Sequence, residues 1–385
     1  MIILLSAGHA CVDVYQGSVA ALVPFFAAER AYGYAAVSGI VLAASLLSSV
    51  AQPVFGALTD RWAMPWLLPS STILGGLGIG LGGLVESYAL TLAFVAVSGI
   101  GVAAYHPEAA RAARSASGGS HTAMGWFSLG GNIGFAAAPL LVTAVMAIGG
   151  LTASPLLVVP AMAGAVLCLP VLRALTRPGP AGGHGAVIVR TDDWRSFGKL
   201  SLAVVFRSIV FVGLSTFVSL YAQQRVGGGT TTGSAALFLL YLGGAGGTLL
   251  GSRLAERCGR IALVRWSYLG TVFAVGGVVF ITGPGFFAFV LLAAVGLYVP
   301  FSLQITLSQD YLPNRVGTAS GVTLGLTVSI GGLASPLLGT IADHTSLRTA
   351  LLPLIALPAL CWLVTRSLSE PLEGVKAYRQ ENLTR

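Results

Sequence analysis

The chain has 385 residues, of which 55% are hydrophobic and 9% charged, and its mean hydropathy is +0.85. A soluble globular domain averages about 25% charged residues, so this composition excludes that class and predicts a protein embedded in lipid. The cysteines are scattered singly, which predicts neither a disulfide framework nor a cysteine-bound metal. They are Cys11, Cys168, Cys258 and Cys361.

Twelve apolar stretches are long enough to cross a hydrocarbon core about 30 Å thick as helices. In chain order they cover residues 2–28, 34–57, 66–86, 89–112, 121–147, 152–175, 199–223, 233–253, 262–282, 285–310, 316–342 and 347–367. Strands of a membrane barrel alternate polar and apolar residues, and these stretches do not. The first has no basic leader or cleavage pattern, so it is interpreted as a span rather than a removable signal. The sequence therefore predicts an all-α polytopic membrane protein.

Basic residues divide unevenly between the two sets of loops. If both termini are cytoplasmic, seventeen of the 21 Lys and Arg fall in inward loops and tails. The outward loops hold only Arg30, Arg225 and Arg348, and Arg207 lies within the seventh span. The positive-inside rule therefore predicts cytoplasmic termini. The formal net charge of +8 is then a topology signal, and we expect no nucleic-acid partner.

The chain is expected to be a duplicated six-helix unit. LTDR at Leu58 recurs as LAER at Leu254, and GGNIGFAAAPLL at Gly130 recurs in shortened form as GGLASPLL at Gly331. Each repeat lies roughly 200 residues after its first copy, as a duplication would give. The predicted organisation is an N-terminal six-helix bundle (1–176), a cytoplasmic linker (177–198), a C-terminal six-helix bundle (199–368) and a cytoplasmic tail (369–385). Pseudo-symmetric halves of this kind are a transporter architecture, with the substrate site between them.

Ionisable residues inside spans are functional candidates, because a charge at the bilayer centre costs roughly 2.5–3.5 kcal/mol on insertion scales. Asp13 lies near mid-bilayer by helix rise, and His9 and Gln16 share its face. Carboxylates are the usual proton relays of pumps. Asp13 is therefore the first candidate for proton coupling, and His9 and Gln16 are candidates for substrate binding. The alternative for Asp13 is a structural partner to a basic group.

Spans one, four, seven and ten each hold one of four charged residues that we expect to share one water-filled cavity. They are Asp13, Glu108, Arg207 and Asp310. Arg207, with Phe211 on its face, is a candidate substrate ligand, because a guanidinium presents a planar fork to phosphate or carboxylate oxygens. The alternative for Arg207 is a static ion-pair partner.

The stretch AYHPEAARAAR ends the fourth span. Pro107, next to His106, is expected to bend the helix and to aim Tyr105 and Glu108 at the cavity. Tyr105 is thus a candidate substrate contact and Glu108 a second candidate for proton coupling. The alternative for Glu108 is a cytoplasmic latch to Arg111 or Arg114.

A further set of residues is predicted to act in gating or structure. LTDR and LAER are expected to form matching cytoplasmic elbows, with Asp60 accepting hydrogen bonds at a neighbouring helix end. The gating or structural candidates are Asp60, Arg61, Arg111, Asn132, Pro139, Glu256, Arg257 and Asp310.

These motifs resemble those of the major facilitator superfamily and, within it, the fosmidomycin resistance group of drug exporters. GALTDR from Gly56 matches the superfamily elbow Gly-x-Leu-x-Asp-Arg. YHPEAARAARSASGGSH from Tyr105, LPNRVGTASG from Leu312 and HACVDVYQG from His9 resemble motifs of the subgroup. The resemblance extends over nearly the whole chain.

The resemblance implies a secondary transporter of the bacterial inner membrane that exports a small drug such as fosmidomycin by proton antiport and alternating access. Asp13, alone or with Glu108, would take a proton from outside as substrate leaves and release it inside as substrate binds. The family works mostly as monomers. No Walker-type loop is present, so we expect no nucleotide or other cofactor, and the proton gradient as energy source.

Two alternatives remain open. Proton-linked uptake of a small hydrophilic solute would use the same residues and differ only in flux direction. A membrane metalloenzyme would use His9, Asp13, His106 and Glu108, and it is disfavoured because the histidines lie at different predicted depths and form no compact ligand motif.

Overall fold

The computed structural model describes residues 1–117, 121–175 and 191–371, apart from the side chains of residues 60, 121–125, 174–175, 316–317, 320–321, 324 and 328–329. Regular structure in this part of the chain is helical throughout. The first half holds α1 (Ile2–Arg30), α2 (Tyr34–Arg61), α3 (Leu67–Gly82), α4 (Tyr88–Ser117), α5 (His121–Gly149), η1 (Gly150–Val158) and α6 (Val159–Leu175). The second half holds α7 (Trp194–Val226), α8 (Gly229–Cys258), α9 (Arg260–Phe280), α10 (Gly285–Tyr311), α11 (Val316–His344), α12 (Leu347–Leu351) and α13 (Pro353–Thr365).

Every predicted span coincides with a helix or with two consecutive helices, so the all-helical membrane fold is confirmed. Ten helical stretches of the described chain are long and apolar enough to cross a membrane. One of them, Trp126–Arg173, covers 48 residues and includes most of two predicted spans, and Leu67–Gly82 is a shorter apolar helix. Twelve crossings stay a prediction. That number is reached only if Trp126–Arg173 is counted as two crossings and the shorter helix Leu67–Gly82 as one.

The second half begins earlier than the sequence predicts. Helix α7 starts at Trp194 rather than at 199, inside the predicted linker. The carboxylate of Asp193 accepts a hydrogen bond from the backbone N–H of Ser196 at 3.0 Å and so caps the helix. Hydrogen bonds from Ser196 also lower the pKa of Asp193. Residues 176–190, which hold most of the linker, lie outside the described part of the chain.

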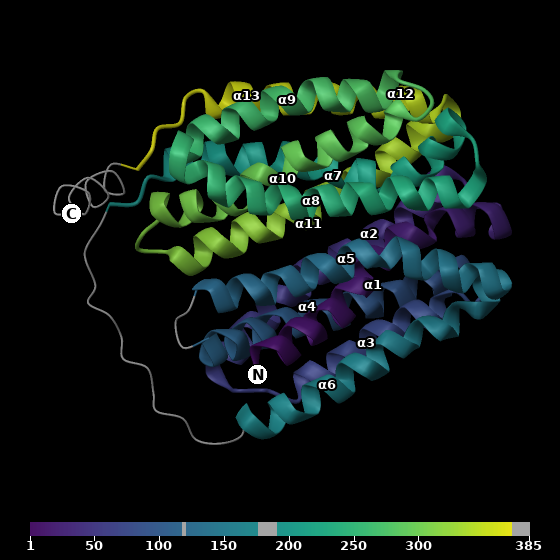
Figure 1. Cartoon of the computed structure of the whole chain (residues 1–385), viewed down its shortest axis with the longest axis horizontal. Helices are drawn as coiled ribbons and strands as arrows, with labels where there is room; N and C mark the ends of the chain where they lie inside the picture. The colour runs from purple at the N-terminus through teal and green to yellow at the C-terminus, as the bar shows by residue number, and fades with distance from the viewer. Residues whose placement is uncertain (118–120, 176–190, 372–385) are drawn as a thin grey trace.

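The two halves lie side by side (Figure 1), with α2 packed against α11 and α5 against α8. The start of α1 and the end of α13 lie toward the left of this view. Hydrogen bonds between the halves gather at the opposite end. Asp343 of α11 accepts from the backbone N–H groups of Tyr34 and Ala35 at 2.7 and 2.9 Å, and Gln224 donates to the hydroxyl of Tyr34 at 3.0 Å. At this end the N-terminus of α2 is therefore capped by the other half of the molecule.

The Gly-rich motif of α5 allows close approach to α1. A methyl group built on Gly130 would collide with the carbonyl oxygen of Ser6, and one on Gly134 with that of Ala10. Small residues are how membrane helices bring their backbones together. This packing fixes α1, and with it Asp13, against α5.

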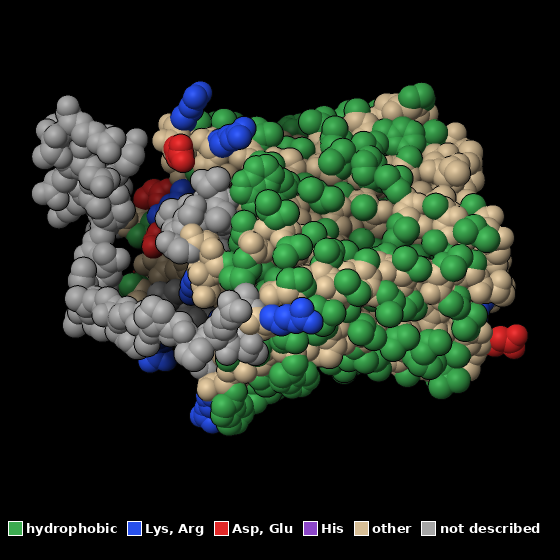
Figure 2. Space-filling view, turned by 60° about the horizontal axis from the view of Figure 1, so that its bottom comes forward, with side chains coloured by type: hydrophobic (Ala, Val, Ile, Leu, Met, Phe, Trp, Pro, Cys, Tyr) green, Lys and Arg blue, Asp and Glu red, His purple; other side chains and the backbone are tan. Residues whose placement is uncertain are grey.

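Apolar side chains are spread over the whole face seen in Figure 2, whereas most visible Lys and Arg lie toward the left. Among the large exposed hydrophobic residues are Trp266 and Phe273, each 71% exposed. Exposed aromatic and aliphatic surface of this extent is what a lipid-facing belt requires.

Candidate functional site

A cavity of about 510 Å³ lies between the two halves, a size typical of small-molecule sites. Its lining comes from α1, α2, α4 and α5 in the first half and from α7, α8, α10 and α11 in the second. Among the described side chains, those of α3, α6, α9 and α13 do not line the cavity. The site is thus shared by both halves, as their duplicated architecture predicts.

One face of α1 supplies the polar wall of the first half. His9, Asp13 and Gln16 all line the cavity, as their helical spacing predicts. Nε2 of His9 lies 3.2 Å from Oδ2 of Asp13, and the Nδ1 atom of His9 lies 3.0 Å from the carbonyl oxygen of Phe127 on α5. Asp13 is only 8% exposed, so this carboxylate depends on protein contacts rather than on bulk water.

His106 of α4 completes this wall. Its Nε2 lies 3.1 Å from Oδ1 of Asp13, and its Nδ1 lies 2.7 Å from the carbonyl oxygen of Val102. From the sequence, His106 was expected beside Pro107 at a bend and was otherwise named only as a ligand in the metalloenzyme alternative. No signal within α4 reveals the contact, because it depends on how α4 packs against α1.

The wall of the second half is aromatic. Phe211, Tyr241, Tyr298 and Phe301 line the cavity there, and the rings of Phe211 and Tyr298 meet edge to face at 5.0 Å. Phe211 was predicted to contact substrate, and it lies on the lining. Aromatic faces of this kind bind the apolar parts of a ligand.

Arg207 lies behind this aromatic wall and does not line the cavity. It is 1% exposed, and its Nε and Nη2 atoms donate to Gln304 and Thr327, each at 3.1 Å. Its guanidinium carbon lies 5.2 Å from the centre of the Phe301 ring. The partners of this buried cation that the structure describes are neutral, so its charge acts on the cavity through Phe301 and Thr327.

Two residues expected at the cavity lie elsewhere. Glu108 is fully buried and is held by Arg111, whose Nε donates to Oε2 at 2.9 Å and whose Nη2 donates to Oε1. Tyr105 is fully buried with its ring 6.2 Å from that of His9. The expectation that α4 aims both at the cavity was wrong, because His106 is the residue of this stretch that lines the cavity. The structure instead shows the alternative given for Glu108, in which its carboxylate pairs with Arg111.

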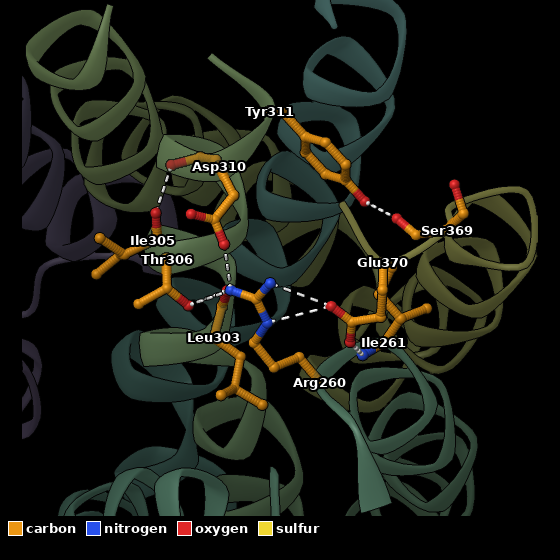
Figure 3. Close-up of polar contacts among 10 residues, drawn as sticks. Arg260, Ile261, Leu303, Ile305, Thr306, Asp310, Tyr311, Ser369 and Glu370 are labelled. Atoms are coloured by element: carbon orange, nitrogen blue, oxygen red, sulfur yellow. Dashed lines mark hydrogen bonds and ion pairs between the residues drawn. The ribbon is translucent and has the colours of Figure 1, made fainter. Parts of the chain in front are cut away.

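The expectation of one cavity shared by four charges was also wrong. Only Asp13 of the four lines it. Asp310 instead accepts from Arg260 at 2.6 Å, and Arg260 also donates to Glu370 at 3.1 Å (Figure 3). Glu370 accepts from the backbone N–H of Ile261 at 3.0 Å as well. The start of the predicted tail is therefore docked against α9 and α10.

The remaining gating candidates are spread through the molecule. Asn132 lines the cavity, and the carbonyl of Pro139 accepts from the hydroxyl of Thr143 at 2.7 Å. The others lie exposed at the ends of α2 and α8, namely Arg61, Glu256 and Arg257. The side chain of Asp60 lies outside the described part of the structure.

His9, Asp13 and His106 each offer a possible metal-ligand atom, and these atoms lie within 4.8 Å of one another. His9 and His106 therefore do not lie at different depths, contrary to the expectation from sequence. Three side chains at these distances can hold a metal ion or exchange protons. The comparisons with known proteins indicate which of the two interpretations applies.

The profile of the Major Facilitator Superfamily matches residues 5–336. The Fosmidomycin resistance protein of Escherichia coli (strain K12) is 30% identical over 375 residues, covering 92% of this chain and 90% of the relative. The uncharacterized MFS-type transporter YfnC of Bacillus subtilis (strain 168) is 27% identical over 378 residues, covering 94% and 90%.

Solved structures share the fold. A bacterial homologue of the human lysosomal transporter Spinster, in an inward-facing and occupied conformation, matches with a TM-score of 0.77 at 16% identity, covering 95% of this chain and 96% of that one. The nucleoside transporter NupG matches with a TM-score of 0.75 at 12% identity, covering 96% and 99%.

Together with the family match and these relatives, the helical fold and the cavity between its halves define a multi-span membrane transporter rather than an enzyme. The chain belongs to the Major Facilitator Superfamily. It is similar over nearly its whole length to the Fosmidomycin resistance protein.

Proposed function

We propose that this transporter exports a small drug-like molecule from the bacterial cytoplasm by alternating access, in exchange for protons. The observation that carries the proposal is the placement of Asp13, the only carboxylate among the described residues that line the cavity, between two histidines. An ionisable group at the centre of a membrane is a costly feature that a proton relay requires.

The proposed substrate is a phosphonate such as fosmidomycin. Its support is the name of the relative that is 30% identical and the chemistry of the cavity. Arg207 supplies positive charge behind the wall, Gln16 and Asn132 supply amide groups, and Phe211 and Tyr298 supply apolar faces. The lining comes from one chain, so the proposal requires only a monomer, with twelve crossings and cytoplasmic termini.

The direction of coupling depends on which atoms the substrate touches. A proton added to the Asp13 cluster makes the cavity more positive, which by charge alone favours an anion. Antiport requires instead that proton and substrate exclude each other. We therefore infer that an exported substrate contacts the same atoms of His9, Asp13 or His106 that receive the proton.

The first test is flux of fosmidomycin into proteoliposomes under an imposed pH gradient. We expect gradient-driven flux in the wild type, its loss in Asp13→Asn, and normal flux in Glu86→Gln, a matched change at an exposed carboxylate between α3 and α4. Flux that survives in Asp13→Asn would remove the coupling role of Asp13. Absence of wild-type flux would reject this phosphonate as substrate.

Titration calorimetry at several pH values separates export from the uptake alternative. Under antiport, substrate binds more tightly as pH rises, because protons leave the shared atoms. Binding that tightens as pH falls would mean that proton and substrate travel together, as proton-linked uptake requires.

A further inference from the structure

Two histidines of the cavity wall point the same ring nitrogen at one carboxylate. Nε2 of His9 faces Oδ2 of Asp13 at 3.2 Å, and Nε2 of His106 faces Oδ1 at 3.1 Å. One histidine lies on α1 and the other on α4, so two independent elements converge on this group. Each carboxylate oxygen has its own imidazole.

The opposite nitrogen of each ring is already occupied. Nδ1 of His9 contacts the carbonyl of Phe127 at 3.0 Å, and Nδ1 of His106 contacts the carbonyl of Val102 at 2.7 Å. A carbonyl oxygen only accepts, so each Nδ1 must carry a hydrogen. Turning either ring over would place carbon atoms against these oxygens, so its two contacts together define the orientation.

A neutral ring with hydrogen on Nδ1 leaves Nε2 as a lone pair. In that state each histidine presents an acceptor to a carboxylate oxygen, which is also an acceptor. Consistently, Nε2 of His9 and Oδ1 of Asp13 are buried without a hydrogen-bond partner, a condition that buried polar atoms rarely tolerate. A proton placed on each Nε2 converts both contacts into charge-assisted N–H···O hydrogen bonds.

We propose that the transported protons are held on Nε2 of His9 and of His106, with Asp13 as their common acceptor, and that the cluster takes up two protons in each transport cycle. This inference rests on the proposed proton coupling and adds its carriers and stoichiometry. The cluster then changes from one net negative charge to one net positive charge between its empty and loaded states. Asp13 is a positioning residue for two imidazoles rather than the sole carrier.

The groups around the cluster support this assignment. Among the described residues that line the cavity, α2 and α5 contribute no ionisable side chain. The other titratable groups nearby are Cys11 and Tyr15 on α1, Tyr105 on α4, Cys168 on α6, Tyr241 on α8 and Tyr298 on α10. The charged group facing it from the second half is Arg207 of α7, behind Tyr298 and Phe301. Hydroxyls, thiols and a guanidinium are poor proton carriers at neutral pH. The two histidines therefore determine how many protons the cluster takes up in each cycle.

Nitrogen NMR of the full chain tests the geometry without any transport assay. The protein is labelled with ¹⁵N-histidine, stripped with a chelator and titrated, and the chain offers five histidines to resolve. Signals are assigned by their loss in His9→Gln and His106→Gln, with exposed His344→Gln as the matched control. We expect both cavity histidines to lose their proton from Nε2 and to become Nδ1–H tautomers. A neutral Nε2–H tautomer at either position would overturn the proposal.

The proton-to-substrate ratio is then measured from the reversal potential in proteoliposomes. We expect a ratio near two in the wild type and in His344→Gln, and a ratio near one in His106→Gln. A wild-type ratio of one, or a ratio unchanged in His106→Gln, would overturn the two-proton inference while leaving proton-coupled export intact. Flux that ignores the gradient would instead contradict the proposed function itself.

Discussion

Glu108 and Asp13 are both carboxylates of the first half, yet their surroundings give them different tasks. Asp13 meets two histidines at the cavity wall, whereas Glu108 is buried against Arg111. Arg111 donates to both carboxylate oxygens of Glu108. The cluster around Asp13 is therefore the proposed site of proton uptake, and the proposed role of Glu108 is structural.

Replacing Glu108 with Gln should therefore reduce stability without changing coupling. The substitution leaves Arg111 without its carboxylate, and we expect a loss on the order of 1–3 kcal/mol. Thermal unfolding of the purified protein measures this loss, with Arg114→Gln, an exposed neighbour, as control. A change in the proton-to-substrate ratio of Glu108→Gln would show that Glu108 does carry protons.

Arg207 should govern affinity for anionic substrates. Its charge lies one side chain behind the lining, so Arg207→Gln is expected to weaken binding of a phosphonate by about tenfold, which corresponds to about 1.4 kcal/mol. Calorimetry with a neutral analogue provides the comparison, because its affinity should change much less. Equal losses for both ligands would indicate a structural role for Arg207.

At the scale of helices, hydropathy and charge predicted the spans well, because crossing a bilayer imposes length and composition on each segment. Periodicity also placed His9, Asp13 and Gln16 on one face. It could not show that α4 turns His106 rather than Tyr105 toward that face, since a helix pattern reveals which residues are neighbours but not which helix they meet. Arg207 was misplaced for the same reason: Phe301 of α10 covers it.

Glycine spacing on α5 offers a test of helix packing. In Gly134→Ala the added methyl group collides with the carbonyl of Ala10, so α5 must move away from α1. We expect lower stability and weaker substrate binding, measured by thermal unfolding and calorimetry. Gly276→Ala on α9, where a methyl group meets nothing within 4 Å, should be neutral or slightly stabilising. Equal behaviour of the two variants would argue against tight packing at Gly134.

At the scale of the molecule, the cap that Asp343 places on α2 holds the two halves together at the end away from the termini. A helix cap contributes about 1 kcal/mol, enough to change a two-state population several-fold. Asp343→Ala should therefore favour conformations open at this end, seen as longer spin-label distances between the start of α2 and the end of α11. Unchanged distances, or an equal change in Asp310→Ala, would deny Asp343 this role.

The ion pairs between acidic side chains and Arg among the described residues each lie within one half. The ion pairs join Glu108 to Arg111, Arg260 to Asp310 and Glu370, and Arg315 to Asp192, and none of them crosses between halves. Hydrogen bonds from neutral donors make up the polar contacts between the described parts of the halves. Ionic strength screens charge pairs most strongly at exposed sites. Salt should therefore have little effect on how fast the halves rock past each other, and turnover measured in dilute and in concentrated buffer should agree.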